Sequence, residues 1–270
     1  MDTENVIKNE VVKVESTTVW SQYLEREVAV DIYLPAQTLV AGEVSLLLIN
    51  DGQDLPKMNF KATLSKLLTD KTIEPILCVG IHAGQDRTNE YGVAFSADYE
   101  GRGAKAGLYT KFIMDELLPF IRMGYLSAFK DKSFAGFSLG ALSALDIVWN
   151  HACEFLTAGV FSGSLWWRRK AYDDGYDDDK DKLMHLQVRT GIGFPWLKFF
   201  IQCGALDESA DRNNNDIIDS IDDALDLVKE LKAKGYTDDH IKFLLLDDGS
   251  HDIDSWAKAV PEFLVWNYKI

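Results

Sequence analysis

The most specific local pattern in the chain is Gly136-Phe137-Ser138-Leu139-Gly140. A short apolar stretch, 132–137, is expected to form a strand before the serine, and a helix is expected to begin directly after it. A serine flanked by small residues between a strand and a helix is typical of a nucleophile elbow, which exposes the hydroxyl above a sheet. The sequence therefore predicts Ser138 as a nucleophile; the alternative is a glycine-rich turn with a structural serine.

Two backbone N–H groups are candidates to stabilise the oxyanion that attack by this serine would create. The N–H of Leu139 would begin a helix, where it has no hydrogen-bond partner within the helix. The second donor should follow an earlier strand. The apolar run 44–50 leads into Asp51-Gly52-Gln53, and we expect the N–H near Gln53 to fill this role, with an ordinary strand-exit turn as the alternative.

A serine nucleophile needs a general base, and the chain has five histidines. His151 follows a predicted helix and His240 begins a predicted strand, so both should lie at the wrong end of the sheet. His185 falls in or near an acidic segment, and His82 precedes the serine in the chain. His251 follows the last apolar strand and should lie at its carboxyl end. We therefore predict His251 as the base.

The base in turn needs an acidic side chain to orient it. The predicted strand 199–204 turns into a loop that carries Asp207, so this carboxylate should reach the same sheet edge as His251. The resulting chain order of serine, aspartate and histidine is a known order for such triads. Glu208 is the second choice for the acid, and Asp211 is a more distant one.

The elements that would position these residues alternate between strands and helices. Two early segments, 11–20 and 27–34, alternate apolar and polar residues, as half-buried antiparallel strands do. Continuous apolar runs, typical of parallel strands covered on both faces, follow at Val44–Asn50, Ile76–Ile81, Ser133–Ser138, Ala158–Ser162, Trp196–Cys203 and His240–Asp247. Helices are expected at Asn59–Leu68, Ala104–Ile121, Leu139–Asn150 and Ile217–Lys234. This α/β pattern predicts a three-layer α/β/α sandwich with a mostly parallel central sheet and antiparallel N-terminal strands.

The composition excludes some classes of partner. The 270 residues include 28 Lys and Arg against 43 Asp and Glu, which gives a formal net charge of −15. This acidic balance disfavours non-specific binding to nucleic acid and a basic membrane-binding surface. The apolar runs are too short to span a membrane, and the first residues lack the features of a secretory signal. We therefore expect a cytoplasmic protein that acts on a small molecule.

The chain shows no internal repeat and no linker rich in Pro, Ser or Gly, which predicts a single domain over residues 1–270. Two acid-rich segments break the alternation of strands and helices, and the one at Asp207–Asp226 has the more ordered spacing. The other is an acidic insertion around 168–195, with six aspartates within 172–181. Such a run of like charges is expected to be exposed and mobile.

Several short runs, taken together, resemble one protein family. They are Arg87–Tyr91, Asp98–Gly103, Tyr109–Ile121, Gly136–Leu142, Phe161–Trp167 and Gly249–Trp256. From about Val28 onward the chain resembles the putative esterase family of α/β hydrolases, which includes enterochelin esterases, S-formylglutathione hydrolase and feruloyl or acetyl-xylan esterases. The resemblance implies an α/β-hydrolase fold and a Ser-Asp-His triad that cleaves carboxylic esters, carried here by Ser138, Asp207 and His251. The insertion lies where the family varies, so the resemblance does not indicate the substrate.

Four side chains are candidates for contact with the substrate: Trp166, Trp167, Arg102 and Tyr91. The two tryptophans follow the carboxyl end of a predicted strand, where an indole can form a wall for an aromatic or sugar group. Arg102 could meet an anionic group, and Tyr91 could line the cleft. For each of the four, core packing or a structural ion pair is the alternative.

The segment 211–222 is acidic but more regularly spaced than the insertion. Oxygen-bearing side chains fall where an EF-hand-type calcium loop has its ligands. The ligands would be Asp211, Asn213, Asn215, Asp219 and Asp222, with the backbone carbonyl of Ile217. Against this, Asp216 replaces the usual glycine, and the last ligand is a shorter acid than glutamate. A structural calcium ion that braces the loop after Asp207 is one expectation, and a solvated acidic loop is the other.

Three functions are compatible with these residues. The first is a serine carboxylesterase that cleaves a small ester through an acyl-enzyme and requires no cofactor for catalysis. The second is an acyltransferase, which would share the acyl-enzyme and differ only in the acceptor. The third is a non-catalytic binding module on a hydrolase scaffold, which the presence of all three triad residues disfavours. Neither the identity of the ester nor the oligomeric state follows from the sequence.

Overall fold

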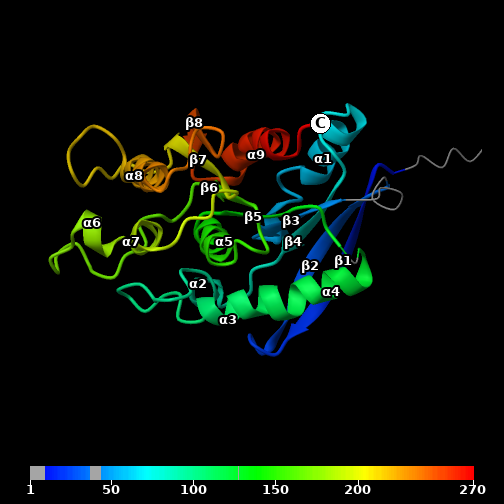
Figure 1. Ribbon diagram of the computed structural model, residues 1–270, viewed down its shortest axis with the longest axis horizontal. Coiled ribbons are helices and arrows are strands. Elements are labelled where there is room, and N and C mark those ends of the chain that lie inside the picture. Colours follow the sequence, from blue (N-terminus) through cyan, green and yellow to red (C-terminus); the bar gives the residue numbers. More distant parts are fainter. Residues whose placement is uncertain (1–9, 37–43, 127) are drawn as a thin grey trace, which may run out of the picture.

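A computed structural model describes residues 10–36, 44–126 and 128–270 of the protein (Figure 1). Its strands form an eight-stranded sheet in the order β1-β2-β4-β3-β5-β6-β7-β8. The strands are β1 (Val12–Ser21), β2 (Arg26–Pro35), β3 (Ser45–Asn50), β4 (Ile76–Ile81), β5 (Lys132–Phe137), β6 (Thr157–Phe161), β7 (Lys198–Leu206) and β8 (Ile241–Ser250). β2 pairs antiparallel with β1 and β4, and all other pairs are parallel.

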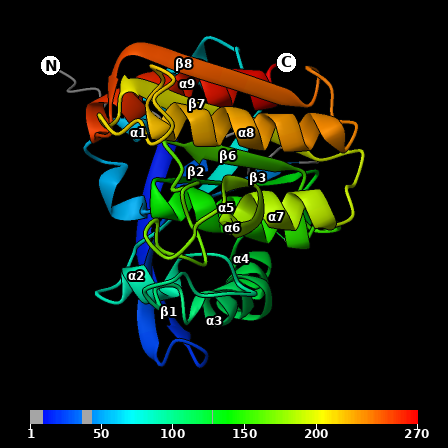
Figure 2. The same ribbon diagram turned by 90° about the vertical axis from the view of Figure 1, so that its left-hand side faces the viewer.

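Helices cover both faces of the sheet (Figures 1 and 2). One face is covered by α1 (Phe60–Thr69) and α9 (Ile253–Tyr268). The other face is covered by the continuous segment α3 (Ala106–Lys111), η3 (Phe112–Leu117) and α4 (Leu118–Gly124), and by α5 (Leu139–Asn150), α7 (Leu183–Thr190) and α8 (Asp219–Ala233). Short helical turns η2 (Gly52–Asp54), α2 (Arg87–Glu90) and α6 (Asp178–Asp181) lie in the loops. The predicted three-layer α/β/α sandwich is confirmed.

The central strands lack an alternating pattern because each contributes to two hydrophobic cores. In β3, Leu46 and Leu48 belong to the core under α5, whereas Leu47 and Ile49 belong to the core under α1 and α9. All six residues of this strand are buried. A strand in this position excludes water from both faces, which makes the sheet a rigid base for the loops at its carboxyl edge.

The last helix is absent from the sequence-based prediction. α9 contains Pro261 in its interior, and proline usually ends or kinks a helix because it lacks an N–H and clashes with the preceding turn. Packing outweighs this local preference here, since Trp256, Phe263 and Leu264 are all buried against the sheet.

The acidic insertion contains buried as well as exposed charged residues. Its aspartates at 173 and 174 are exposed, but Asp181 is fully buried, and the expectation of exposure is wrong at this residue. Asp181 accepts a hydrogen bond from Arg169 Nε at 2.6 Å, and its charge is thereby compensated. The next residue, Lys182, is also buried and pairs with Asp223 at 3.1 Å, which attaches α7 to α8.

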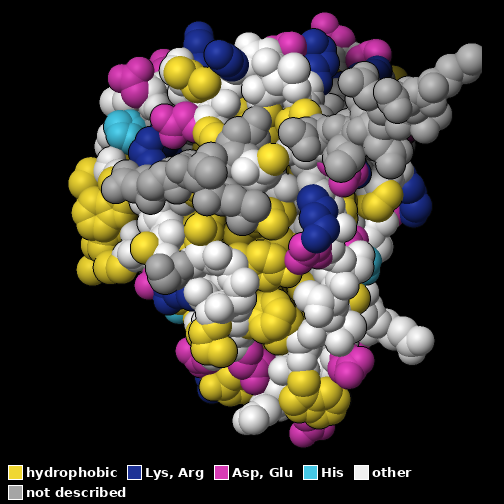
Figure 3. Space-filling model, turned by 90° about the vertical axis from the view of Figure 1, so that its right-hand side faces the viewer, with side chains coloured by type: hydrophobic (Ala, Val, Ile, Leu, Met, Phe, Trp, Pro, Cys, Tyr) yellow, Lys and Arg dark blue, Asp and Glu magenta, His cyan; other side chains and the backbone are white. Residues whose placement is uncertain are grey.

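On the face shown in Figure 3, acidic and basic side chains are scattered among hydrophobic ones. Among the helices of the described ranges, none has both the length and the apolar character needed to cross a membrane.

Candidate active site

Ser138 occupies a strained turn between β5 and α5. It has φ 54° and ψ −121°, a left-handed conformation that is costly for a residue with a side chain. The turn requires small neighbours: a Cβ at Gly136 would collide with the backbone of Gly140, and a Cβ at Gly140 would collide with the carboxylate of Asp51. The geometry is therefore that of a nucleophile elbow.

His251 lies opposite this serine, with its Nε2 atom 2.9 Å from Ser138 Oγ. The loop that carries the histidine joins β8 to α9 and is fixed by the first turn of that helix. Asp252 caps α9 by accepting a hydrogen bond from the N–H of Ser255 at 2.8 Å, and Ser255 Oγ accepts one from the N–H of Ser250 at 2.8 Å. The structure thus brings together the predicted nucleophile and base.

Asp207 follows β7 near an irregularity in the pairing with β8. Both carboxylate oxygens are buried and have no hydrogen-bond donor among the described residues. Although His251 is an exposed residue, packing desolvates its imidazole and lowers its pKa, while the nearby Asp207 carboxylate acts in the opposite direction. An unpaired buried carboxylate is costly, and the free Nδ1–H of an imidazole is the kind of donor that would satisfy it.

The second choices for the acid are placed less favourably. Glu208 is exposed, and Asp211 accepts hydrogen bonds from the N–H groups of Asn215 and Asp216 within its own loop, at 3.2 and 3.0 Å. Neither contributes to the pKa of His251, whereas Asp207 does.

The two candidate oxyanion donors lie at the starts of adjacent helical turns. Leu139 is the first residue of α5, and Gln53 is in η2, which follows β3 directly. The first N–H groups of a helical turn have no partner within it, so both are free to face a ligand. The side chain of Gln53 points elsewhere, because its Oε1 accepts a hydrogen bond from the N–H of Ala83 at 3.0 Å.

An ion pair missed by the sequence analysis holds the loop after β3 in place. Asp51 has φ 59° and is buried, and its two carboxylate oxygens accept hydrogen bonds from Arg87 Nε and Nη2 at 2.7 and 2.8 Å. The Nη2 group also lies 3.4 Å from the carbonyl oxygen of Phe137, the residue before Ser138. The only available signal was the run Arg87–Tyr91, which the sequence analysis used for the family resemblance alone.

The predicted substrate-binding residues are not all accessible. Tyr91 and Trp167 are 1% and 0% exposed, so their expected contact with a substrate is corrected to core packing. The reason is their size: the Trp167 ring packs against Gly92 and Gly103, and the Tyr91 ring packs against the ring of Tyr109. Trp166 is partly exposed, and the guanidinium of Arg102 lies 5.0 Å from its ring centroid. Arg102 also pairs with Asp98 at 2.5 Å, which neutralises its charge.

The segment 211–222 folds into a loop stabilised by its own side chains. The Nδ2 groups of Asn213 and Asn215 both donate to Asp222 Oδ2 at 2.8 Å, and Asp219 accepts a hydrogen bond from the N–H of Arg212 at 2.8 Å. In the described ranges no group of three or more His, Cys, Asp and Glu side chains is arranged to hold a metal ion. The calcium ion remains a prediction.

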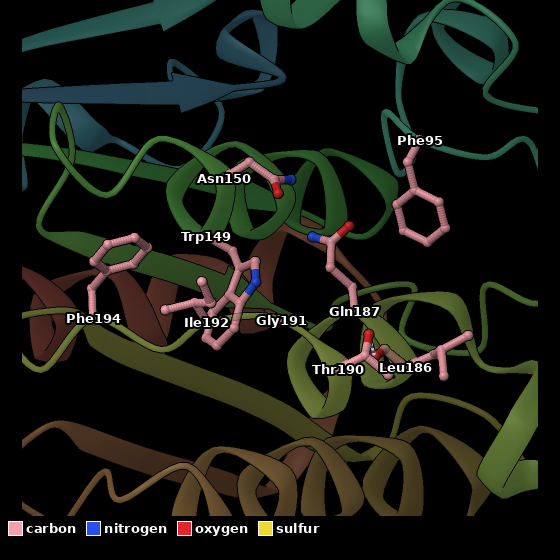
Figure 4. A pocket seen from close by; sticks show the side chains of 9 residues that line it. All are labelled: Phe95, Trp149, Asn150, Leu186, Gln187, Thr190, Gly191, Ile192 and Phe194. Atoms are coloured by element: carbon pink, nitrogen blue, oxygen red, sulfur yellow. Dashed lines mark hydrogen bonds between the residues drawn. The ribbon is translucent and has the colours of Figure 1, made fainter.

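A surface pocket of about 390 Å³ lies away from these residues, between the end of α5 and the end of α7 (Figure 4). Trp149 and Asn150 of α5 line it. Because Ser138 precedes the first residue of the same helix, the pocket lies at the opposite end of α5 from Ser138.

Comparison with known proteins decides the family. A model of the family described as Putative esterase matches residues 21–266. The chain belongs to this family. The esterase is therefore a hydrolase that acts on ester bonds. A comparison with curated proteins finds no match.

Solved structures share the fold of the esterase at low sequence identity. A ferulic acid esterase is 19% identical at a TM-score of 0.71, and the match covers 96% of this chain and 98% of that one. The enterobactin esterase FES from Shigella flexneri, in the presence of enterobactin, is 19% identical at a TM-score of 0.73 and is matched over 94% of this chain and 58% of its own. An IroE-like serine hydrolase from Shewanella oneidensis is 19% identical at a TM-score of 0.71, over 94% and 79% of the two chains. The esterase thus spans little more than half of the Shigella chain.

Proposed function

We propose that the protein is a serine carboxylesterase that cleaves a small ester through an acyl-enzyme formed on Ser138. The observation that carries the proposal is the 2.9 Å approach of His251 Nε2 to Ser138 Oγ at a strained strand–helix turn. Asp207 completes the triad as the acid that orients His251. The buried, unpaired state of its carboxylate supports this role.

The reaction follows from the positions of these groups. Neutral His251 accepts the hydroxyl proton as Ser138 Oγ attacks the ester carbonyl carbon, and the carbonyl oxygen becomes an oxyanion. The N–H groups of Leu139 and Gln53 stabilise that oxyanion. The intermediate collapses, the protonated imidazole gives its proton to the departing alcohol, and an ester to Ser138 remains. Water, deprotonated by His251, then attacks this ester and releases the carboxylic acid.

The expected substrate is a small-molecule ester. Two of the proteins that share the fold are named for ferulic acid and enterobactin. These names support a small-molecule ester, rather than an ester on a polymer, as the first substrate to test. Trp166, with Arg102 against its ring, is the partly exposed aromatic surface that follows β6 near the nucleophile. We propose it as a wall for the substrate.

Hydrolysis of p-nitrophenyl acetate and butyrate tests the proposal. Wild type is expected to turn over both esters and to be labelled by a fluorophosphonate. Ser138→Ala should lose activity by several orders of magnitude and lose the label. Ser209→Ala, which changes an exposed serine in the loop after Asp207, serves as the matched control and should retain both. EDTA should leave turnover unchanged. A wild type that neither turns over the esters nor reacts with the probe would rule out the esterase mechanism.

A further inference from the structure

Trp256 links the nucleophile turn to the catalytic base. Its ring stacks on Phe137, the residue before the nucleophile, with 5.2 Å between ring centroids and 28° between the planes. It also packs against the imidazole of His251 in a T-shaped arrangement, with 5.3 Å between ring centroids and 79° between the planes. One side chain therefore touches both sides of the reacting pair, through contacts that aromatic rings favour.

A buried hydrogen bond fixes the indole in this position. Trp256 Nε1 donates to Ser162 Oγ at 3.0 Å, and both residues are buried. Ser162 follows β6 in a left-handed conformation with φ 42°, and its N–H donates to the carbonyl oxygen of Gln202 on β7 at 2.9 Å. The acceptor for the indole is thus held by two neighbouring strands of the rigid sheet.

Resting on the function proposed above, we propose that the Trp256 indole, held by Ser162, is a positioning residue that keeps the His251 imidazole directed at the nucleophile. Such a restraint on the imidazole complements Asp207, whose carboxylate accepts no hydrogen bond from the described residues. An acid bonded to the imidazole restrains its tautomer, whereas a large ring packed beside the imidazole restrains its rotation. A base that rotates away from Ser138 Oγ cannot accept its proton, so the indole acts on turnover and not on substrate binding.

The indole also shields the imidazole from water. Three charged groups face His251 from the surrounding elements: Asp207 after β7 and Asp252 at the start of α9 raise its pKa, and Arg87 in α2 lowers it. Desolvation is the largest influence and lowers the pKa. Because the ring of Trp256 is part of the desolvating surface, a smaller side chain would hydrate His251 and raise its pKa while the three charged groups stay in place.

The test compares Trp256→Phe and Ser162→Ala with Trp266→Phe, the same type of change on the same helix but away from the site. Trp256→Phe removes the indole N–H and shrinks the ring, and Ser162→Ala removes its acceptor. Both are expected to lower kcat about 10- to 100-fold with little change in KM, as misplacement of a reacting group does. In Trp256→Phe the acid limb of the pH–rate profile should also move to higher pH. Trp266→Phe should leave kcat, KM and the pH profile unchanged.

An NMR titration of the His251 ring nitrogens keeps the test independent of turnover. The pKa of His251 should be higher in Trp256→Phe than in wild type and unchanged in Trp266→Phe. If wild type proves inactive and unlabelled by a fluorophosphonate, the proposed function fails and the titration alone decides the positioning role. A folded Trp256→Phe variant with wild-type kcat and a wild-type His251 pKa would overturn the proposal, and so would equal effects in Trp266→Phe.

Discussion

Asn50 donates a hydrogen bond from its side-chain Nδ2 to the carbonyl oxygen of Gly140 at 2.7 Å. Its Oδ1 accepts one from the hydroxyl of Tyr109 at 2.5 Å, so the amide is held from both ends. The bond ties the end of β3, which leads directly into η2, to the first turn of α5, and η2 and α5 carry the N–H groups expected to bind the oxyanion. The spacing of the two donors is therefore set before any substrate binds, which is the condition for effective oxyanion stabilisation.

The first prediction concerns the ion pair beside this bond. Arg87→Lys should lower kcat about 10- to 100-fold, because lysine cannot make the bidentate pair that holds Asp51 in its strained conformation, and the N–H of Gln53 would shift. Steady-state kinetics on p-nitrophenyl esters measures the change. Lys57→Ala removes an exposed ion pair to Asp54 in the same loop and should have no effect. Wild-type kcat in Arg87→Lys would exclude the pair from a positioning role.

The second prediction identifies the acid of the triad. Asp207→Asn should reduce kcat about 10⁴-fold, since an amide cannot hold the imidazole in the required tautomer or stabilise its charged form. Glu208→Gln, the neighbouring change of the same type, should leave kcat within a few-fold of wild type because Glu208 is exposed. If the larger loss falls on Glu208→Gln, the acid is Glu208.

The third prediction is the pH dependence of hydrolysis. The base must be neutral to accept a proton, so kcat/KM should fall on the acid side as His251 becomes protonated. Desolvation lowers the pKa of His251 from 6.5, which places the midpoint of the acid limb below pH 6.5. A profile of kcat/KM between pH 4.5 and 9 measures the midpoint of the acid limb. A midpoint above that of a free imidazole would mean that Asp207 outweighs desolvation.

The fourth prediction concerns stability. His185 is buried in α7 with its Nε2 atom 2.7 Å from the carbonyl oxygen of Asp223, and burial lowers its pKa to about 4. The unfolded chain therefore binds the proton more readily than the folded chain. Neutral, buried His185 therefore contributes to the free energy of unfolding at pH values above its unfolded pKa of about 6.5. That contribution is lost as the pH falls toward 4, because the unfolded chain takes up the proton first. His185→Gln should reduce the loss of stability between pH 6.5 and 4.

Urea unfolding at several pH values measures this difference. His240→Gln provides the control, because His240 lies in a loop and is partly exposed. It should keep the pH dependence of wild type. Identical pH dependence in wild type and His185→Gln would show that the buried histidine is not the group responsible.

Strands and the nucleophile turn were predictable because their signals are local. β4 has the predicted bounds, and α5 has the predicted first and last residues. β8 extends past its predicted end at Asp247 to Ser250, since an edge strand has one side in solvent and tolerates an acidic residue such as Asp248. In the sequence the apolar residues end at Leu246, whereas the strand continues to Ser250.

Contacts between distant segments were not predictable. Asp51 and Arg87 are 36 residues apart, and Ser162 and Trp256 are 94 residues apart. No periodicity or spacing connects them, because each pair forms only after the sheet has assembled and has placed its loops. The burial of Tyr91 and Trp167 was not predictable either, because tyrosine and tryptophan side chains occur both in binding clefts and in hydrophobic cores.

The left-handed backbone conformation of Ser138 implies a trade-off between activity and thermal stability. Glycine is the one residue that adopts such a conformation without strain, so Ser138→Gly would relieve it while deleting the hydroxyl that we propose attacks the ester. A selection for thermal resistance alone would favour that loss, as it does wherever a working group is held in a costly conformation. Directed evolution of a thermally more stable variant must therefore screen for ester hydrolysis in every round.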